Sequence, residues 1–266
     1  MKIFKSEYSN NYSNYTFSYA TYAIKENDND TTAIYLNGFL PYTGKTDIKY
    51  PVFYLARSLR IDLSNFIDSS ENRRVNRKLN GIIPKIEKYN INDFDTTNKD
   101  FIDFCMDYAK QRFSEKAMDQ KRFEYILNTG IATDIFKFIN PVNNHVIGYV
   151  LAIVNQEIFH YWFSFFDIEY MKNFPLGKWM MWKMIKWSQK NNLKYIFLGT
   201  GYGTKSLYKI RDFKGLEFFD GNIWNSDIKY LKGLCKSDEN IKNSDLFKLI
   251  DNPNEYLETI IFKIKN

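Results

Sequence analysis

The stretch HVIGYVLAIVNQEIFHYWFSFF, residues 145–166, decides the fold. It holds two apolar runs, 145–154 and 157–166, on either side of Asn155–Gln156. Runs rich in β-branched and aromatic residues that are joined by a short polar link are typical of a β-hairpin. A third run of this kind, TDIFKFIN, precedes them at 133–140. The three runs together predict an antiparallel meander.

The segments after the meander alternate between helix and strand patterns. LGKWMMWKMIKWSQKNN (176–192) repeats apolar residues every three or four positions, which predicts a helix with one apolar face. KYIFLG (194–199) predicts a buried strand, and a helix around 205–212 precedes another strand in GLEFFDG. The order strand, strand, strand, helix, strand, helix, strand is that of the GNAT-type acyltransferase fold. We therefore expect an α+β chain with a GNAT-like mixed sheet flanked by helices.

The composition excludes several classes of protein. Of the 266 residues, 44% are hydrophobic, and 37 Lys+Arg against 31 Asp+Glu give a net charge of +6. This excludes a disordered chain and suits, without requiring, a phosphate-bearing partner. No apolar run approaches the ~20 residues that span a bilayer, and the N-terminus lacks a signal-peptide core. Two cysteines and two histidines argue against a disulfide framework and a multi-histidine metal site, so we expect a cytoplasmic protein without a membrane partner.

A basic helix is predicted over residues 69–80. Ser69 or Ser70 can cap its start, and Arg73, Arg74, Arg77 and Lys78 then lie one turn apart in pairs. Such a helix can grip a phosphodiester backbone through its guanidinium groups. It can equally be a solvated face without a partner, and the charge spacing leaves both interpretations open.

Two further segments and one pair of carboxylates could carry chemistry. FPLGKW (174–179) opens the long helix, and its free N–H groups would attract an anion. It holds only Gly177 where acetyl-CoA users carry a Q/R-x-x-G-x-G/A loop, so it is a poor pyrophosphate cradle.

GTGYGTKSLYK (199–209) is a glycine-rich turn that permits close approach of a ligand, or a plain connection between strand and helix. Asp167 and Glu169 could deprotonate an amine or bind a cationic group, or simply precede a helix.

Several segments together resemble the arginyl-tRNA–protein transferase family, including its bacterial leucyl-transferring relatives. RIDLSNFIDSSENRRVNRK (60–78) is similar to the family stretch R-V-P-V-x-x-F-x-P-S-R-S-Q-R-R-V-x-R-R without a gap. HYWFSFFDIEY (160–170) resembles S-x-V-Y-x-F-x-D-P, and YIFLG (195–199) resembles Y-x-Y-L-G-Y. KSLYK (205–209) resembles K-M-x-Y-K, and the whole resemblance covers roughly residues 36–225.

The sequence departs from the family pattern in its N-terminal part. The family's C-x-x-C pair is absent, and Phe53 and Ala56 stand about where it would fall. Thr200 replaces the tyrosine expected after Leu198-Gly199. We therefore expect no metal or iron–sulfur cluster. Because the family is thought to meet its acceptor protein through this part, we expect a different acceptor here: a peptide, a small metabolite or another protein end.

The resemblance implies transfer of an amino acid from aminoacyl-tRNA to an amino group of a protein, peptide or small-molecule acceptor. Arginine is the amino acid that the resemblance leads us to expect. No cofactor is expected beyond aminoacyl-tRNA as co-substrate. The long stretch before the helix at 176 leaves room for a second, diverged copy of the fold. We therefore expect a double GNAT arrangement of the Fem/aminoacyl-tRNA transferase type, with a diverged GNAT-like, acceptor-binding region at 1–95 and a GNAT-like catalytic domain at 96–266. The residues assigned to catalysis are Asp167, Lys205 and Tyr208; those assigned to tRNA are Arg60, Arg73, Arg74, Arg77, Lys78 and Lys209; those assigned to the substrate are Phe165, Glu169, Gly177, Gly199 and Tyr202.

Two other functions stay open at this point. An acyl-CoA-dependent N-acyltransferase of the GNAT type would share the same order of elements. A non-catalytic tRNA-binding module would share the basic helix and need none of the assigned catalytic residues.

Overall fold

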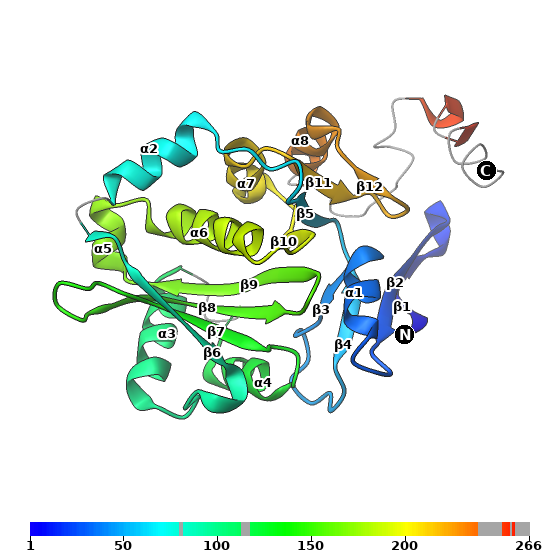
Figure 1. Cartoon of the computed structure of the whole chain (residues 1–266). Helices are drawn as coiled ribbons and strands as arrows, with labels where there is room; N and C mark the ends of the chain where they lie inside the picture. The colour runs from blue at the N-terminus through cyan, green and yellow to red at the C-terminus, as the bar shows by residue number, and fades with distance from the viewer. Residues whose placement is uncertain (80–81, 113–117, 239–251, 256, 259–266) are drawn as a thin grey trace.

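The computed structural model describes residues 1–79, 82–112, 118–238, 252–255 and 257–258, and its strands form two sheets (Figure 1). The larger sheet has the order β12 (Trp224–Asn225), β11 (Leu216–Phe219), β5 (Ser58–Asp62), β10 (Tyr195–Thr200), β9 (Ile158–Phe166), β8 (Val146–Val154), β7 (Asp134–Ile139) and β6 (Lys85–Asn90). The smaller has the order β1 (Lys2–Asn11), β2 (Thr16–Ile24), β4 (Val52–Leu55) and β3 (Phe39–Pro41).

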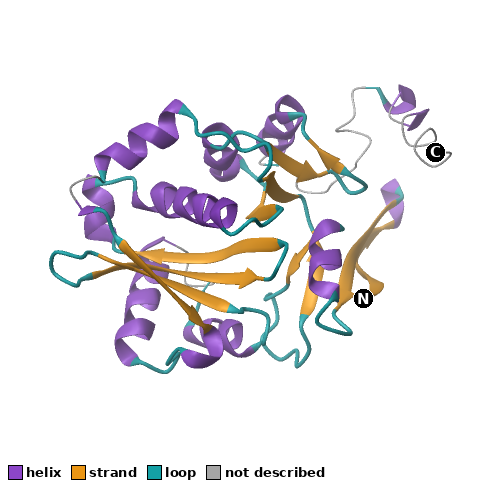
Figure 2. Cartoon of the chain, viewed as in Figure 1, coloured by secondary structure: helices purple, strands orange, loops and turns teal. Residues whose placement is uncertain are grey.

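Helices cover both faces of the larger sheet (Figure 2). On one face lie α6 (Leu176–Lys190), α2 (Ser70–Lys78) and α7 (Leu207–Asp212), and on the other lie α3 (Lys99–Arg112) and α4 (Gln120–Asn128). The remaining α-helices are α1 (Asp30–Leu36), α5 (Ile168–Asn173) and α8 (Ile228–Ser237), and the single-turn 3-10 helices are η1 (Tyr12–Asn14), η3 (Ile91–Asp93) and η4 (Thr204–Ser206). Among the described helices, none is both long and apolar enough to cross a bilayer.

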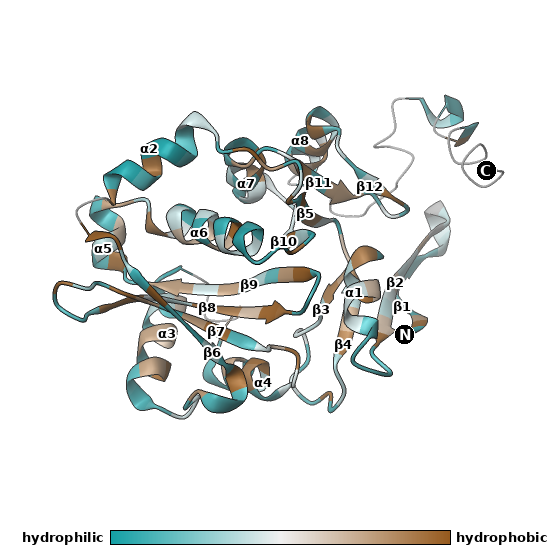
Figure 3. Ribbon diagram, viewed as in Figure 1, coloured by the Kyte–Doolittle hydropathy of each residue, from teal (hydrophilic) through white to brown (hydrophobic). Residues whose placement is uncertain are grey.

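The predicted fold class is confirmed, because β7, β8 and β9 form the antiparallel meander and α6 packs on it before β10 returns to the sheet. Apolar residues follow the strands of this sheet, whereas α2 is mostly hydrophilic (Figure 3). On α6 the face that carries Met180 and Met184 is fully buried. The apolar period of this segment therefore reflects burial against the sheet.

The N-terminal part is divided differently between the sheets than the sequence indicates. The β-branched and alternating apolar residues of VFYLARSLRIDL (52–63) predict a strand, and the segment forms two: β4 in the small sheet and β5 in the large sheet, with Ala56–Arg57 between them. Strands β5 and β6 both precede residue 96 and yet belong to the large sheet. The boundary at 95 stays a prediction, but the sheet that carries the cavity draws strands from both sides of it.

Strands β9 and β10 separate partway along their length. They pair in parallel from Tyr195↔Ile158 to Phe197↔His160, and no pairing is found beyond that point. The register of β9 against β8 shifts at Trp162, since Tyr161 and Phe163 pair with consecutive residues of β8. A bulge of this kind bends the strand away from its neighbour. The gap between the diverging strands is where the main cavity lies.

The small sheet packs against the part of the large sheet where β9 and β10 still pair. Helix α1 contributes Ile34 and Tyr35 to a buried cluster that also holds Ile158 and Phe197 from β9 and β10. This contact brings β3, β4 and the loop after β3 to one side of the gap.

Candidate active site

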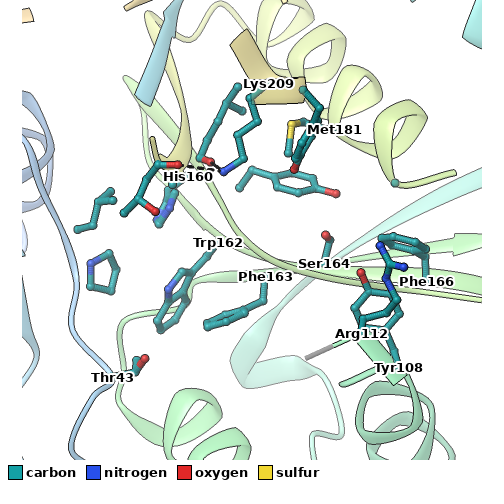
Figure 4. A pocket seen from close by; sticks show the side chains of 18 of the residues that line it. Thr43, Tyr108, Arg112, His160, Trp162, Phe163, Ser164, Phe166, Met181 and Lys209 are labelled. Atoms are coloured by element: carbon teal, nitrogen blue, oxygen red, sulfur yellow. Dashed lines mark hydrogen bonds between the residues drawn. The ribbon is translucent and has the colours of Figure 1, made fainter. Parts of the chain in front are cut away.

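A cavity of about 550 Å³ lies between β9 and β10 (Figure 4). Helices from both faces of the sheet line it, since α6 and α7 contribute side chains as well as α3 and α4. The lining residues are Leu40, Pro41, Thr43, Tyr54, Tyr108, Arg112, Arg122, His160–Ser164, Phe166, Gly177, Lys178, Met181, Leu198–Thr200, Tyr208 and Lys209. A ligand in this space can therefore be reached from both faces of the sheet.

The charged side chains of the described lining are all basic. They are Arg112 on α3, Arg122 on α4, Lys178 on α6 and Lys209 on α7, and no aspartate or glutamate accompanies them. Arg122 donates a hydrogen bond to Thr43 Oγ1 at 2.8 Å, which ties α4 to the loop after β3. Clefts lined by one sign of charge concentrate ligands of the opposite sign. The cavity is therefore suited to a ligand that carries or develops negative charge.

Lys209 supplies the most deeply placed cation. Its Nζ donates to Leu198 O at 2.7 Å and to Thr200 O at 3.3 Å, at the end of β10. Desolvation of the ammonium lowers the pKa of Lys209 to about 8. Gly199, between the two acceptors, has a φ of +78°, which turns both carbonyls toward this ammonium. The glycine and the lysine that the sequence singles out separately thus form one unit.

His160 presents an imidazole nitrogen without a hydrogen-bond partner among the described residues. Its Nδ1 is 2.8 Å from the hydroxyl of Tyr35 on α1, whereas Nε2 is buried and unpaired. Burial, and then the charge of Lys209, lowers the pKa of His160 to about 3. The imidazole is therefore neutral at physiological pH. If Tyr35 accepts from Nδ1–H, Nε2 is left as a free hydrogen-bond acceptor.

Hydroxyl groups surround the same space. Tyr108, Tyr161, Ser164 and Tyr208 line it from three elements, and burial raises the pKa of Tyr208 to about 12. Phenols whose pKa is raised stay protonated and can donate hydrogen bonds. These groups can hold oxygen atoms of a ligand without adding charge.

Ion pairs join the basic helix α2 to the cavity wall. Lys178, in the first turn of α6, lies 2.8 Å from Asp212 and 2.9 Å from Glu71 on α2. Asp212 is almost fully buried, and its backbone oxygen accepts a hydrogen bond from Asn72 Nδ2 at 3.1 Å. The helix start that Ser69 caps is thereby held against α7 and α6.

The four basic residues of α2 are all exposed, as both interpretations of this helix require. Arg74 is held by Glu71 at 2.7 Å, and Arg73 donates to the backbone oxygen of Asp68. Arg77 and Lys78 lie in the last turn of the helix. The predicted tRNA-binding surface thus stands beside the wall that carries Lys178.

Four other predicted residues line the cavity: Gly177, Gly199, Tyr208 and Lys209. Gly177 also has a packing role. A Cβ on this residue would lie 2.7 Å from the ring of Phe166, so the glycine lets α6 pack on β9. Its assignment to the substrate stays a prediction.

Three predicted acidic or basic residues lie outside the cavity lining. Asp167 caps α5 by accepting from the N–H of Tyr170 at 3.0 Å, and its other oxygen is 2.6 Å from His145 Nε2. Glu169 is exposed and pairs with Lys172 at 2.7 Å. Lys205 is exposed on η4. The structure does not bring these three side chains together with Tyr208 and Lys209.

Three more predicted residues are engaged in the protein itself. Arg60 is buried on β5, pairs with Glu217 at 2.8 Å, and lies between the rings of Tyr195 and Trp224. Phe165 is fully buried on the α3 face of the sheet. Tyr202 is half exposed, and its hydroxyl accepts from the Arg57 N–H at 2.8 Å. Arg60 and Phe165 are therefore unavailable to a ligand in this structure.

Sequence reasoning missed His160, Tyr35, Arg112, Arg122 and Lys178. His160 lies in a run of aromatic residues, a setting that favours a structural histidine. Arg112 stands at the arginine of the family pattern Y-x-x-Y/F-x-x-x-R, to which no role was assigned, and Arg122 carries no motif of its own. A signal for Lys178 was present, because it adjoins Gly177 at the start of the long helix.

One family model matches a segment beside the cavity. Residues 140–210 match a family model described as an acetyltransferase (GNAT) domain. This segment contains β8, β9, α5, α6, β10 and most of α7, and of these β9, α6, β10 and α7 contribute residues to the cavity lining. No curated protein matches the chain.

Three solved structures are similar to part of the chain. L-PGS from Bacillus licheniformis has 9% identity over 65% of this chain, with a TM-score of 0.39. The C-terminal domain of a candidate lysylphosphatidylglycerol synthetase from Agrobacterium fabrum has 10% identity over 69%, with a TM-score of 0.40. FemX has 11% identity over 67%, with a TM-score of 0.39. The chain spans 52%, 55% and 61% of the lengths of these three chains, respectively.

Proposed function

We propose that the protein is an N-acyltransferase that moves an aminoacyl group from aminoacyl-tRNA to an amine. One observation carries this proposal: the exposed basic helix α2 is ion-paired, through Glu71 and Lys178, to the wall of a cavity whose described charges are all positive. A polyanion bound along α2 would place its end near Lys178, and phosphates are the ligands that arginine-rich helices hold best.

The reaction needs alignment more than activation. The nitrogen of a neutral amine attacks the ester carbonyl of the aminoacyl-tRNA, a C–N bond forms, and the C–O bond to the terminal ribose breaks. The amine loses one proton, and the ribose oxygen gains one. Because the ester is already activated, correct placement of the two reactants supplies much of the rate.

Two lining residues are suited to the charges that develop. The Lys209 ammonium can stabilise negative charge on the ester oxygen, as a preorganised donor in a desolvated site. The free Nε2 of His160 can accept a hydrogen bond from the attacking amine and orient its lone pair. Protonated Tyr208 can hold a ribose or carbonyl oxygen. Arg73, Arg74, Arg77 and Lys78 would bind tRNA phosphates.

Asp167 and Lys205 stay predictions from the resemblance. Since neither lines the cavity, an effect of Asp167→Asn on turnover would have to act through α5. Arginine as the donated residue is likewise a prediction, and the described lining offers no carboxylate to receive a guanidinium group. The donor is therefore best sought in a pool of all charged tRNAs.

An acyl-CoA-dependent N-acyltransferase is the second candidate, and the match of 140–210 to the acetyltransferase family model favours it. The single glycine at the start of α6 weighs against it, because the ring of Phe166 occupies the space beside Gly177. A backbone cradle for a pyrophosphate needs that space.

The test is incubation with a pool of charged, labelled tRNAs and a panel of amines, with Lys209→Met and an exposed-lysine control, Lys121→Ala, run in parallel. We expect label to move from tRNA to an amine with wild type and Lys121→Ala, and far less with Lys209→Met. The proposal fails if no label leaves the tRNA, and acetyl-CoA turnover under the same conditions would select the second candidate.

A further inference from the structure

Strand β1 is a free edge that the rest of the described chain does not cover. It is the outermost strand of the small sheet, pairs only with β2, and all ten of its residues are exposed. Large apolar side chains project from it, with Phe4 38% and Tyr8 68% exposed. Long uncovered edges with apolar side chains are templates for pairing with another strand. The hairpin of β1 and β2 stands out at one side of the molecule (Figure 1).

We propose that β1 pairs antiparallel with β1 of a second copy of this chain, which joins the two small sheets into one continuous sheet. The charges on the strand are what point to a second copy. Lys5 and Glu7 flank Ser6 and project from the same face, because they pair with Thr21 and Tyr19 of β2. A two-fold axis through Ser6 would set Lys5 of each copy opposite Glu7 of the other.

The same two charges select this register over its neighbour. In an antiparallel pair, residues that face each other across the two strands have their side chains on the same face of the sheet. A two-fold axis perpendicular to the sheet satisfies this only if it lies midway between the two copies of one residue, which is the sense in which the axis passes through that residue. An axis through Lys5 would set two lysines opposite each other, which is unfavourable. An axis through Ser6 instead makes two opposite-charge pairs. Within the described residues Lys5 forms no ion pair, and Glu7 accepts only from Asn10 Nδ2.

This surface is independent of the candidate active site. The regular part of β1, from Lys2 to Glu7, ends at a register shift between Glu7 and Ser9. Pairing about Ser6 therefore opposes residues 5–7 of the two copies within this regular part, whereas residues 2–4 would face residues 8–10 across the shift. Two-fold pairing uses the β1 edge of both copies and leaves neither free for a third. A closed dimer, not a fibre, is the assembly that this edge supports.

A charge-swap series measured by sedimentation equilibrium tests the proposal on the untagged full chain. Wild type should be a reversible dimer. Lys5→Glu alone and Glu7→Lys alone should each raise the dimer dissociation constant about tenfold or more, because two attractive pairs become repulsive. The double variant Lys5→Glu/Glu7→Lys should return it to within about threefold of wild type. Lys121→Glu, an exposed charge change on α4, should leave it unchanged.

A second measurement guards against variants that fold poorly. Far-ultraviolet circular dichroism should be unchanged across the series, and hydrogen exchange within residues 5–7 should slow as wild-type concentration rises. A monomer at all concentrations overturns the proposal. So does a dimer that is indifferent to the single swaps or is not restored by the double variant.

Discussion

Acid should destabilise this protein through His160 before its carboxylates titrate. The imidazole is 1% exposed, and burial lowers its pKa from 6.5 to about 3. Between these values the unfolded chain binds a proton at this residue that the folded chain does not. The free energy of unfolding must therefore fall as the pH drops from about 6.5 toward 3.

The size of the loss follows from the two pKa values. At pH 5 the unfolded imidazole is almost fully protonated and the folded one almost fully neutral. The linkage relation then gives a loss of about 2 kcal/mol between pH 7 and pH 5. This is a large share of the stability of an ordinary domain. The window lies above the range where Asp212 and Glu71, whose pKa values are lowered, begin to bind protons.

Urea unfolding followed by tryptophan fluorescence at pH 7, 6 and 5 measures this loss. His160→Asn keeps a group that can bond to the Tyr35 hydroxyl but does not titrate. It should lose about 2 kcal/mol less than wild type over the window. His145→Asn, at the only other histidine, is the matched control and should keep the loss due to His160. Equal losses in wild type and His160→Asn would refute the assignment of a buried neutral imidazole.

The remaining predictions concern the proposed activity and the network beside it. Turnover with an amine that is already neutral at pH 7 should fall about tenfold between pH 7 and 9, because Lys209 loses its proton near pH 8. Lys209→Arg should abolish this fall. A decline that persists in Lys209→Arg would exclude Lys209 as the group whose titration lowers turnover. Asp212→Asn should lower the free energy of unfolding in urea by about 2 kcal/mol, since a buried carboxylate is lost from Lys178. Arg211→Met, which removes a mostly exposed partner of the same carboxylate, should cost less than about 1 kcal/mol, and equal costs would contradict this ranking. Arg77→Ala should weaken tRNA binding and reduce the slope of log affinity against log salt concentration by about one. Lys121→Ala, on the opposite face of the large sheet, should change neither quantity. If Arg77→Ala leaves tRNA binding unchanged at low salt, α2 is not part of the tRNA-binding surface.

Much of the fold followed from local periodicity. The meander, α6 and β10 are predicted because each carries an apolar pattern with the period of its own secondary structure, and burial against the sheet keeps that pattern. The start of α2 follows from Ser69, whose hydroxyl accepts from the Asn72 N–H at 3.1 Å. These signals lie within a few residues of the elements that they define, so a sequence read alone contains them.

The make-up of the cavity depends instead on contacts between residues far apart in the chain. His160 meets Tyr35, 125 residues away, only because the small sheet packs on the ends of β9 and β10. Asp167 resembles a family position and yet serves as a helix cap, and Arg60 belongs to a basic motif and yet lies between two rings. A residue's type and neighbours in sequence determine which secondary structure it joins. Strand register, the bulge at Trp162 and long-range packing determine what its side chain faces, and no local pattern encodes them.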